Sequence, residues 1–450
     1  MEKEVRDDTG KTVSKAGIPS FDFLACSVYG LFGLMVFSGV FLAVRYVPTF
    51  TQAFSSVEQL NETVPFGWMV RRLHGAGGSL LLLALVIHLL RILSVGAYKV
   101  RPRIAWVLEV LLVFSALWIN LTGTFLPLSQ SAFWGMNTIL SSLSSLPWVG
   151  SFMVDFLRGG RELGGTALVR FYSMHIGFSA LVGLLLFFHH WMGTTEGMAR
   201  GYRSANQNLL TGLVLAGLLL SVTTFLPGWF VDPLKGAANP TLNPERVSFP
   251  WYILFMPETL PLLSAAYPSW TLTVLILLLL LLFLLPFIDR SPEQDLLLRP
   301  FVMAFSAAFL IAGIYFSVIG SASAHYGERV MVPNRLLSAV ELRGAKVFAE
   351  KNCAYCHQVA GRLGRRQGPD MTVVAQRGRS RDWIQRFIFN ARLYQPGTAM
   401  PRYEIPLDDL EALSAYLLSL DGRKETFTAM DRFHLREMSI YSEFQREEKR

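Results

Sequence analysis

Long apolar stretches, separated by shorter polar segments, dominate the first three quarters of the chain. Seven of them have about the 20 residues that a helix needs to cross a hydrocarbon core of roughly 30 Å. They lie near 22–46, 68–94, 104–125, 168–192, 208–230, 269–288 and 300–321. The pattern predicts an all-α protein with seven transmembrane helices, followed from about residue 333 by a polar and basic region.

The polar and proline-rich connections divide the chain into parts. We expect residues 126–167 to form short amphipathic helices at a membrane surface, whereas the connection at 231–267 is rich in proline. We predict a four-helix bundle, a three-helix region, a small all-α domain and a charged tail that is helical or disordered. These parts comprise residues 1–205, 206–325, 335–422 and 423–450, respectively.

Composition and charge set the expected location. Apolar residues make up 52% of the chain, and the net charge of +8 gathers in loops and in the last third. This distribution indicates acidic protein partners and no nucleic acid. Basic residues in loops on the N-terminal side place that side in the cytoplasm; they are Lys99, Arg101, Arg103, Arg200 and Arg203. With seven spans, the C-terminal region then lies on the exported side of a bacterial cytoplasmic membrane.

Histidines inside two of the predicted spans repeat at one interval. His74 and His88 are separated by 14 residues, and so are His175 and His189. Fourteen residues of α-helix return to within roughly 40° of the starting face and advance about 21 Å, so each pair lies on one face at two depths. A lone buried histidine is more often a hydrogen-bonded core residue. Four at matched spacing favour two bis-histidine sites, each for one non-covalent haem b.

Arginines and glycines near these histidines fit the same reading. Arg71, Arg91 and Arg170 lie near helix ends, where guanidinium groups could pair with haem propionates; positive-inside or snorkelling charge is the alternative. Small residues would let porphyrin planes approach the backbone, and simple helix packing is the alternative. These residues are Gly30, Gly33, Gly39, Gly75, Gly77, Gly78 and Gly123.

Four runs of sequence resemble the cytochrome b subunit of cytochrome bc complexes, especially the split plastid and bacterial form. They are FGWMVRRLH (66–74), KVRPRIAW (99–106), LPLSQSAFWG (126–135) and LRGGRELGGTALVRFYSMH (157–175). The resemblance implies that His74 and His175 hold a haem near the exported face. It assigns His88, with either His189 or His190, to a haem near the cytoplasmic face. The smaller angular offset slightly favours His189.

Two features depart from the family pattern. Cys26 is about three residues from a cysteine that tethers an extra haem in some relatives, so an ordinary buried thiol is favoured. Many relatives have Pro-Glu-Trp-Tyr where this chain has Pro-Trp-Tyr at 250–252, but some bacterial relatives carry a glutamate six residues later, where Glu258 stands. We therefore predict Glu258 as the base that accepts a quinol proton, with Tyr252 as its hydrogen-bond partner. Helix capping by Glu258 is the alternative.

The run CAYCH at 353–357 is typical of covalent haem attachment. In this motif two thiols, here Cys353 and Cys356, add to the haem vinyl groups, and the adjacent imidazole, here His357, binds iron. A zinc-binding or redox-active cysteine pair is the alternative.

Residues around this motif predict a complete small haem domain. An amphipathic helix at 344–352 leads into the motif, and GTAMP at 397–401 offers Met400 as a thioether ligand. Residues 338–421 as a whole resemble a class I cytochrome c, with the glycine-proline turn of that family at 368–369. A plain core methionine is the alternative for Met400.

These observations predict a membrane quinol:cytochrome c oxidoreductase subunit that moves electrons between quinol, two b haems and one c haem. The chain has no cysteine-histidine set for a Rieske cluster. We therefore expect a separate Rieske iron-sulfur subunit and a soluble or membrane c-type cytochrome as partners, and the resemblance implies a homodimer. The alternatives are a non-bifurcating cytochrome c:quinone reductase, which the altered Pro-Trp-Tyr loop favours, and a haem scaffold without quinone chemistry.

Overall fold

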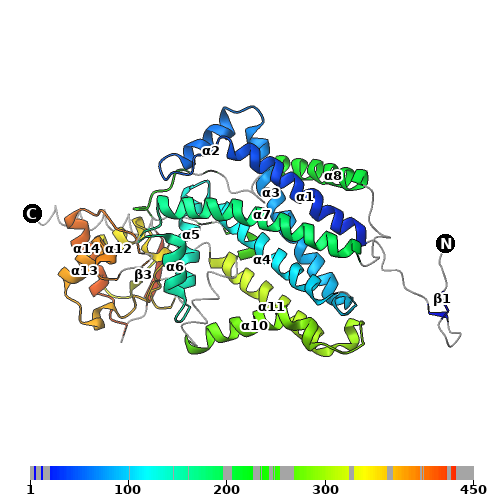
Figure 1. Ribbon diagram of the computed structural model, residues 1–450. Coiled ribbons are helices and arrows are strands. Elements are labelled where there is room, and N and C mark those ends of the chain that lie inside the picture. Colours follow the sequence, from blue (N-terminus) through cyan, green and yellow to red (C-terminus); the bar gives the residue numbers. More distant parts are fainter. Residues whose placement is uncertain are drawn as a thin grey trace, which may run out of the picture.

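A computed structural model gives the arrangement of most of the chain (Figure 1). It describes residues 5–6, 12–13, 21–100, 102–144, 146–160, 162–195, 205–226, 234, 236–242, 247, 249–253, 268–323, 329–361, 368–395, 398, 400–422 and 427–431. A bundle of long helices is followed by a small C-terminal domain, which lies beside one end of the bundle (Figure 1).

A long helix in the described residues corresponds to each predicted span, although α1 and α8 end a few residues before the predicted ends of theirs. They are α1 (Phe21–Ala43), α3 (Gly67–Ser94), α4 (Arg103–Phe125), α7 (Gly165–Thr195), α8 (Ala205–Phe225), α10 (Pro268–Ile288) and α11 (Pro300–Ser323). Over the described residues, α3, α4 and α7 are long and apolar enough to cross a membrane, and α1, α10 and α11 contain shorter apolar stretches. These helices are those of a membrane protein, and the count of seven spans stays a prediction.

The core of the bundle is formed by α1, α3, α4 and α7. Helix α4 packs along α7, α1 packs along α3, and α3 also contacts α4, while α8 covers α1 and α3. Leu31, Leu85, Phe125 and Phe171 are almost completely buried in one apolar cluster that joins these four helices. Burial of this kind fixes how the inward faces of α3 and α7 meet, and both carry the predicted haem ligands.

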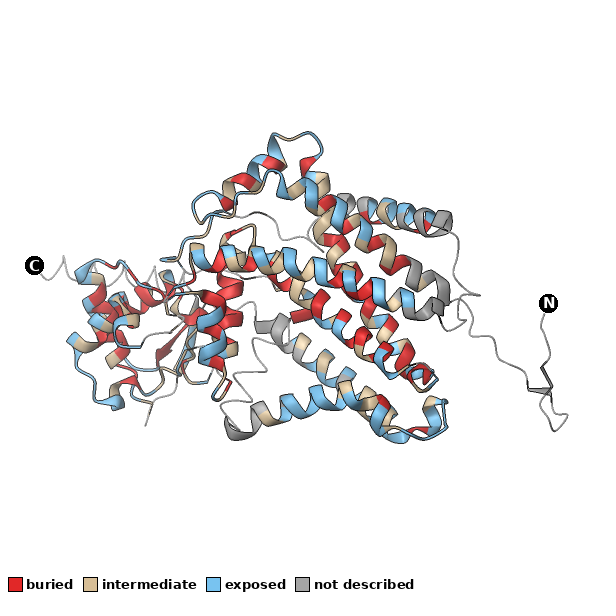
Figure 2. Ribbon diagram, in the orientation of Figure 1, coloured by how far each residue is buried: buried red, intermediate tan, exposed pale blue. Residues whose placement is uncertain are grey.

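Helices α10 and α11 lie on the outside of the bundle and expose much of their apolar surface (Figure 2). Helix α10 contacts α4, where Phe283 stacks on Phe114 with ring centroids 6.2 Å apart. Away from that contact, the exposed fraction is 58% for Leu277, 90% for Phe301 and 66% for Ile311. Apolar area of this extent is expected to face lipid or a partner protein and not water.

Short helices cover the end of the bundle near the C-terminal domain. Helix α2 (Ala53–Glu62) follows α1, and α5 (Gln130–Ser144) and α6 (Gly150–Arg158) fill the connection between α4 and α7, as the sequence predicts. Residues 236–242 pack against the start of α5, because Ser129 and Ala237 form an antiparallel bridge. The loop before α10 is thereby held at this end.

The opposite end of the bundle is closed by a cluster of polar and charged groups. Short turns lie at η1 (Ala97–Lys99) and η4 (Leu296–Leu298), between the long helices. The guanidinium of Arg299 is buried and donates to the Tyr98 hydroxyl at 3.1 Å, and Tyr98 donates to Asp289. Lys99 Nζ lies 2.9 Å from Asp289 Oδ2. The cluster therefore fastens the α3–α4 turn to the α10–α11 turn.

The C-terminal domain is built mainly from helices. It contains α12 (Ala339–Glu350), η5 (Cys353–Tyr355), η6 (Val374–Arg377), α13 (Arg381–Phe389), η7 (Ala391–Leu393) and α14 (Leu407–Leu418). Helix α12 begins at a capping box formed by Ser338 and Glu341. It crosses α14 so closely that a Cβ at Gly344 would lie 2.0 Å from the Ala412 carbonyl oxygen. Glycine at this position lets the two backbones meet.

Two short antiparallel sheets depart from the predicted all-α fold. Strands β1 (Val5–Arg6) and β2 (Thr12–Val13) form one, and β3 (Arg329–Pro333) pairs with β4 (Phe427–Asp431) to form the other. The expectation that the whole tail is helical or disordered was therefore wrong for β4. Its partner strand is buried in the domain core, so β4 gains apolar contacts from residues that are remote in sequence.

Candidate functional site

The first imidazole pair lies between α3 and α7, on the side of the C-terminal domain. The rings of His74 and His175 have centroids 6.1 Å apart. Ser38 Oγ lies 3.0 Å from His74 Nδ1, and His175 Nδ1 lies 3.0 Å from the Ile119 carbonyl oxygen, to which it donates. Because Nδ1 of each ring is held by the protein, Nε2 remains to bind a metal.

Glycines bring the backbone against both rings of this pair. A Cβ at Gly39 of α1 would lie 3.1 Å from His74 Cε1, and a Cβ at Gly123 of α4 would lie 2.9 Å from His175 Cε1. Any side chain at these positions would crowd the imidazoles. The donor set and the bare backbone around it fit a haem held by two histidines.

The second imidazole pair lies deeper in the bundle, at the interval that the sequence predicts. The ring centroids of His88 and His189 are 6.1 Å apart. Glu109 of α4, which the sequence analysis did not single out, lies between them and is 1% exposed. Its Oε1 is 3.0 Å from His88 Nε2 and 3.2 Å from His189 Nε2. The side chain of His190 lies outside the described part of the chain.

The three predicted propionate-binding arginines have different surroundings. Arg71 Nε donates to Asn61 Oδ1 at 2.9 Å, near the start of α3. Arg170 donates to the Phe156 carbonyl and lies 5.7 Å from the centroid of the Phe156 ring. Arg91 is half-buried in the last turn of α3. Arg71 and Arg91 lie near opposite ends of α3, each on the side of one imidazole pair.

The Pro-Trp-Tyr loop forms the short turn η3 (Trp251–Ile253). Tyr252 is 8% exposed and belongs to the apolar cluster of the bundle. Burial raises the pKa of the Tyr252 hydroxyl, which therefore stays protonated and able to donate a hydrogen bond. Glu258 lies outside the described residues, so its pairing with Tyr252 stays a prediction.

The structure holds the histidine of the CxxCH segment in place through one ring nitrogen. His357 Nδ1 donates to the Pro369 carbonyl oxygen at 3.0 Å, which leaves Nε2 for iron. A Cβ at Gly368 would lie 2.3 Å from His357 Cε1, so only glycine fits beneath the ring. Burial lowers the pKa of His357 and favours the neutral imidazole that binds metal. Cys353 is a free, half-buried thiol, and Met400 packs at the same apolar core.

Comparison with protein families covers most of the chain. Residues 12–197 match the family model described as cytochrome b/b6/petB, and residues 237–338 match cytochrome b(C-terminal)/b6/petD. Residues 342–421 match the cytochrome c model. The chain therefore consists of a cytochrome b part followed by a cytochrome c domain. The two families imply haem b and haem c, and with them an oxidoreductase role in membrane electron transport.

A solved structure has the same fold over much of its length. The chain is similar to a chain of a hyperthermophilic respiratory Complex III, with a TM-score of 0.56 and 22% sequence identity. The similarity covers 66% of this chain and 83% of that one. At this identity the likeness supports the helical fold and not a particular substrate.

The cytochrome c domain contacts the cytochrome b bundle through its CxxCH segment. Tyr355 is buried in the apolar cluster of the bundle, and Cys356 packs against the same cluster. Arg392 forms an ion pair with Glu162, in the connection between α6 and α7. In Figure 1 the domain lies beside α5 and α6, at the end opposite β1.

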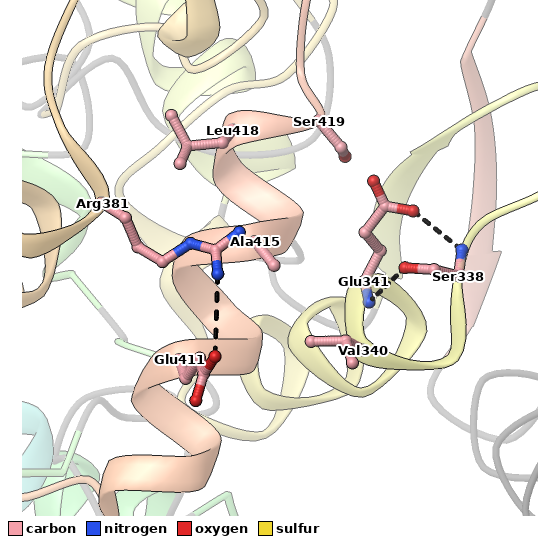
Figure 3. Close-up of a pocket in the computed structure, with 8 residues that line it drawn as sticks. All are labelled: Ser338, Val340, Glu341, Arg381, Glu411, Ala415, Leu418 and Ser419. Atoms are coloured by element: carbon pink, nitrogen blue, oxygen red, sulfur yellow. Dashed lines mark hydrogen bonds and ion pairs between the residues drawn. The ribbon is translucent and has the colours of Figure 1, made fainter.

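A surface pocket of about 350 Å³ also lies on the cytochrome c domain. It is lined by Ser338, Val340, Glu341, Arg381, Glu411, Ala415, Leu418 and Ser419. Figure 3 shows the capping box of α12 on one side and the ion pair of Arg381 with Glu411, at 3.6 Å, on the other. The predicted haem ligands are not among these residues, so the pocket is separate from the haem site.

Proposed function

We propose that this chain is the haem-carrying subunit of a membrane quinol:cytochrome c oxidoreductase. In this proposal His74 and His175 hold one haem b, His88 and His189 hold a second, and the cytochrome c domain holds a covalent haem. The thioether bonds come from Cys353 and Cys356, and the axial ligands are His357 and Met400. Electrons would pass between quinol, the two b haems and the c haem.

The observation that carries the proposal is the stacking of two imidazole pairs between the same two helices. Both pairs have ring centroids 6.1 Å apart, and each joins α3 to α7. Fourteen helical residues separate the pairs by about 21 Å, so the two sites would conduct electrons through most of a bilayer. The cytochrome c domain at one end of the bundle supports an exit for electrons on that side.

The site of quinol oxidation in this proposal is the loop near Tyr252, at the same end of the bundle. Tyr252 is buried in the apolar cluster of the bundle, and its hydroxyl would hold the quinol or Glu258, the proposed proton acceptor. A separate Rieske iron-sulfur subunit would take one electron, and a c-type cytochrome would receive it further on. We also propose a homodimer in a bacterial cytoplasmic membrane, with the N-terminus in the cytoplasm and the c domain exported.

The lack of the usual glutamate before Trp251 supports one second candidate. A chain with this loop could run without bifurcation, as a cytochrome c:quinone reductase fed by soluble c cytochromes. In that case quinol would not reduce the b haems through a site at Tyr252. The two candidates therefore differ in which donor reduces the haems.

A haem-resolved difference spectrum of the purified full chain tests the proposal. Quinol is added with and without an inhibitor of quinol oxidation at the exported face, and the b and c bands are followed separately. We expect quinol to reduce both kinds of haem and the inhibitor to block it. Reduction by dithionite but never by quinol contradicts the proposal and favours the second candidate.

The ligand choice between His189 and His190 has its own test. We expect His189→Ala to lose one of two b haems, measured as haem b per c haem, while His190→Ala retains both. Equal retention in the two variants contradicts the assignment of His189.

A further inference from the structure

The two imidazole pairs of the cytochrome b domain have different neighbours on α4. Gly123 brings the bare backbone against His175 in the first pair. If the bundle repeated with the 14-residue interval of the histidines, the second pair would have a glycine at position 109. That position is Glu109, so the interval that repeats the ligands does not repeat their surroundings.

Glu109 reaches the atoms that would bind iron in the second site. One carboxylate oxygen lies 3.0 Å from His88 Nε2 and 3.2 Å from His189 Nε2. The side chain is 2% exposed, within a bundle that is apolar at this depth. A porphyrin between the rings would displace the carboxylate from the two nitrogens, but α4 would still hold it beside the haem.

We propose that Glu109 is an electrostatic residue of the second haem site and lowers the reduction potential of that haem. The proposal rests on the proposed function only in taking His88 and His189 as haem ligands. A ferric porphyrin with two neutral imidazoles carries one positive charge, and the ferrous form carries none. A carboxylate held nearby in a low-dielectric interior therefore stabilises the ferric state.

The consequence is a difference between the two b haems that is built into one helix. The first haem meets only backbone at Gly123, whereas the second meets an anion one interval away on α4. An electron on the first haem therefore gains less by moving to the second than it would with glycine at position 109. This residue sets the driving force for transfer across the membrane.

Redox titration of the purified full chain tests this directly. The b bands are followed optically with mediators and dithionite, so the readout needs no quinol chemistry, and His88→Ala identifies the second haem. We expect Glu109→Gln to raise the reduced-to-oxidised ratio of that haem about tenfold or more at a fixed potential. For a one-electron couple, a tenfold change corresponds to about 59 mV.

Controls separate charge from shape. Glu109→Asp keeps the charge, so its reduced-to-oxidised ratio should stay within about threefold of the wild-type value. Glu109→Gly removes the charge and copies Gly123, so it should shift the ratio as far as the glutamine variant does. The haem at His74 is an internal reference, and its reduction potential should not change.

The proposal is overturned if the glutamine variant matches the wild type or if the aspartate variant shifts as far as the glutamine one. It is also overturned if the wild-type chain binds one haem b and Glu109→Gly binds two. If the glutamine variant shows the expected shift but quinol does not reduce the haems of the wild-type chain, the result counts against the proposed function alone.

Discussion

Substitution of Gly123 by alanine should weaken haem binding at the first imidazole pair. The new Cβ would lie 2.9 Å from His175 Cε1, whereas ordinary van der Waals contact begins at 3.4 Å. Neither neighbour yields easily, because α4 packs along α7 and His175 Nδ1 is hydrogen-bonded to Ile119. Overpacking of this kind costs about 1–3 kcal/mol. At about 1.4 kcal/mol per factor of ten, haem affinity should fall roughly 5- to 150-fold.

The matched control is Gly177→Ala on α7. A Cβ there has no neighbour within 4 Å, so it makes the same change to a helix interior without the contact. The ratio of haem b to haem c in the purified chain is measured by the pyridine haemochrome assay. Titration with added haem then gives the affinity of the first site. We expect Gly123→Ala to require much more haem for half-saturation of the first site. Equal affinity in the two variants would refute the reasoning that bare backbone shapes this site.

Three further predictions concern the cytochrome c domain and the opposite end of the bundle. Gly344→Ala places a Cβ 2.0 Å from a carbonyl oxygen and should cost the domain about 3 kcal/mol, seen as a lower thermal midpoint of the c-haem bands. Met400→Ala should lower the c-haem potential and abolish the weak sulfur-to-iron band; an unchanged spectrum contradicts the ligand assignment. Burial raises the pKa of Asp289 but hydrogen bonds from Tyr98 and Lys99 lower it more, to about 2. This group stabilises the fold above its unfolded pKa of about 3.8, and the stability is lost as pH falls through about 2. Hydrogen exchange of this turn should therefore rise below about pH 4, and Asp289→Asn should remove that dependence.

Much of the site is encoded locally and was predictable from sequence. The interval from His74 to His88 is a property of one helix, and the CxxCH run places two candidate attachment cysteines and one candidate iron ligand within five residues. The structure brings His74 to His175 and His88 to His189 at equal ring separations. The family matches agree with the two predicted cytochromes. Periodicity predicts this pairing because the candidate ligands repeat along a helix axis.

Features that depend on contacts between remote segments were missed. Glu109 is one acidic residue in an apolar helix, and only its position beside α3 and α7 shows that it meets two imidazoles. The sequence did contain a signal for Glu109, because this residue stands 14 residues before Gly123, the same interval that separates the histidines. Strand β4 is a similar case. Its pairing with β3 joins segments almost 100 residues apart, and no local pattern in a charged tail predicts that partner.

The cytochrome c domain and the Pro-Trp-Tyr loop share one apolar core, which makes their positions interdependent. Tyr252 of the loop and Tyr355 of the CxxCH segment both belong to the cluster that runs into the bundle, with Trp134 of α5 as a further member. Cys356 packs against that cluster, so this proposed attachment cysteine is held against cytochrome b and not on the free side of the domain. Close packing transmits displacements. A volume change in this core should therefore move the loop and the haem anchor together, which a flexible tether between the two cytochromes would not do.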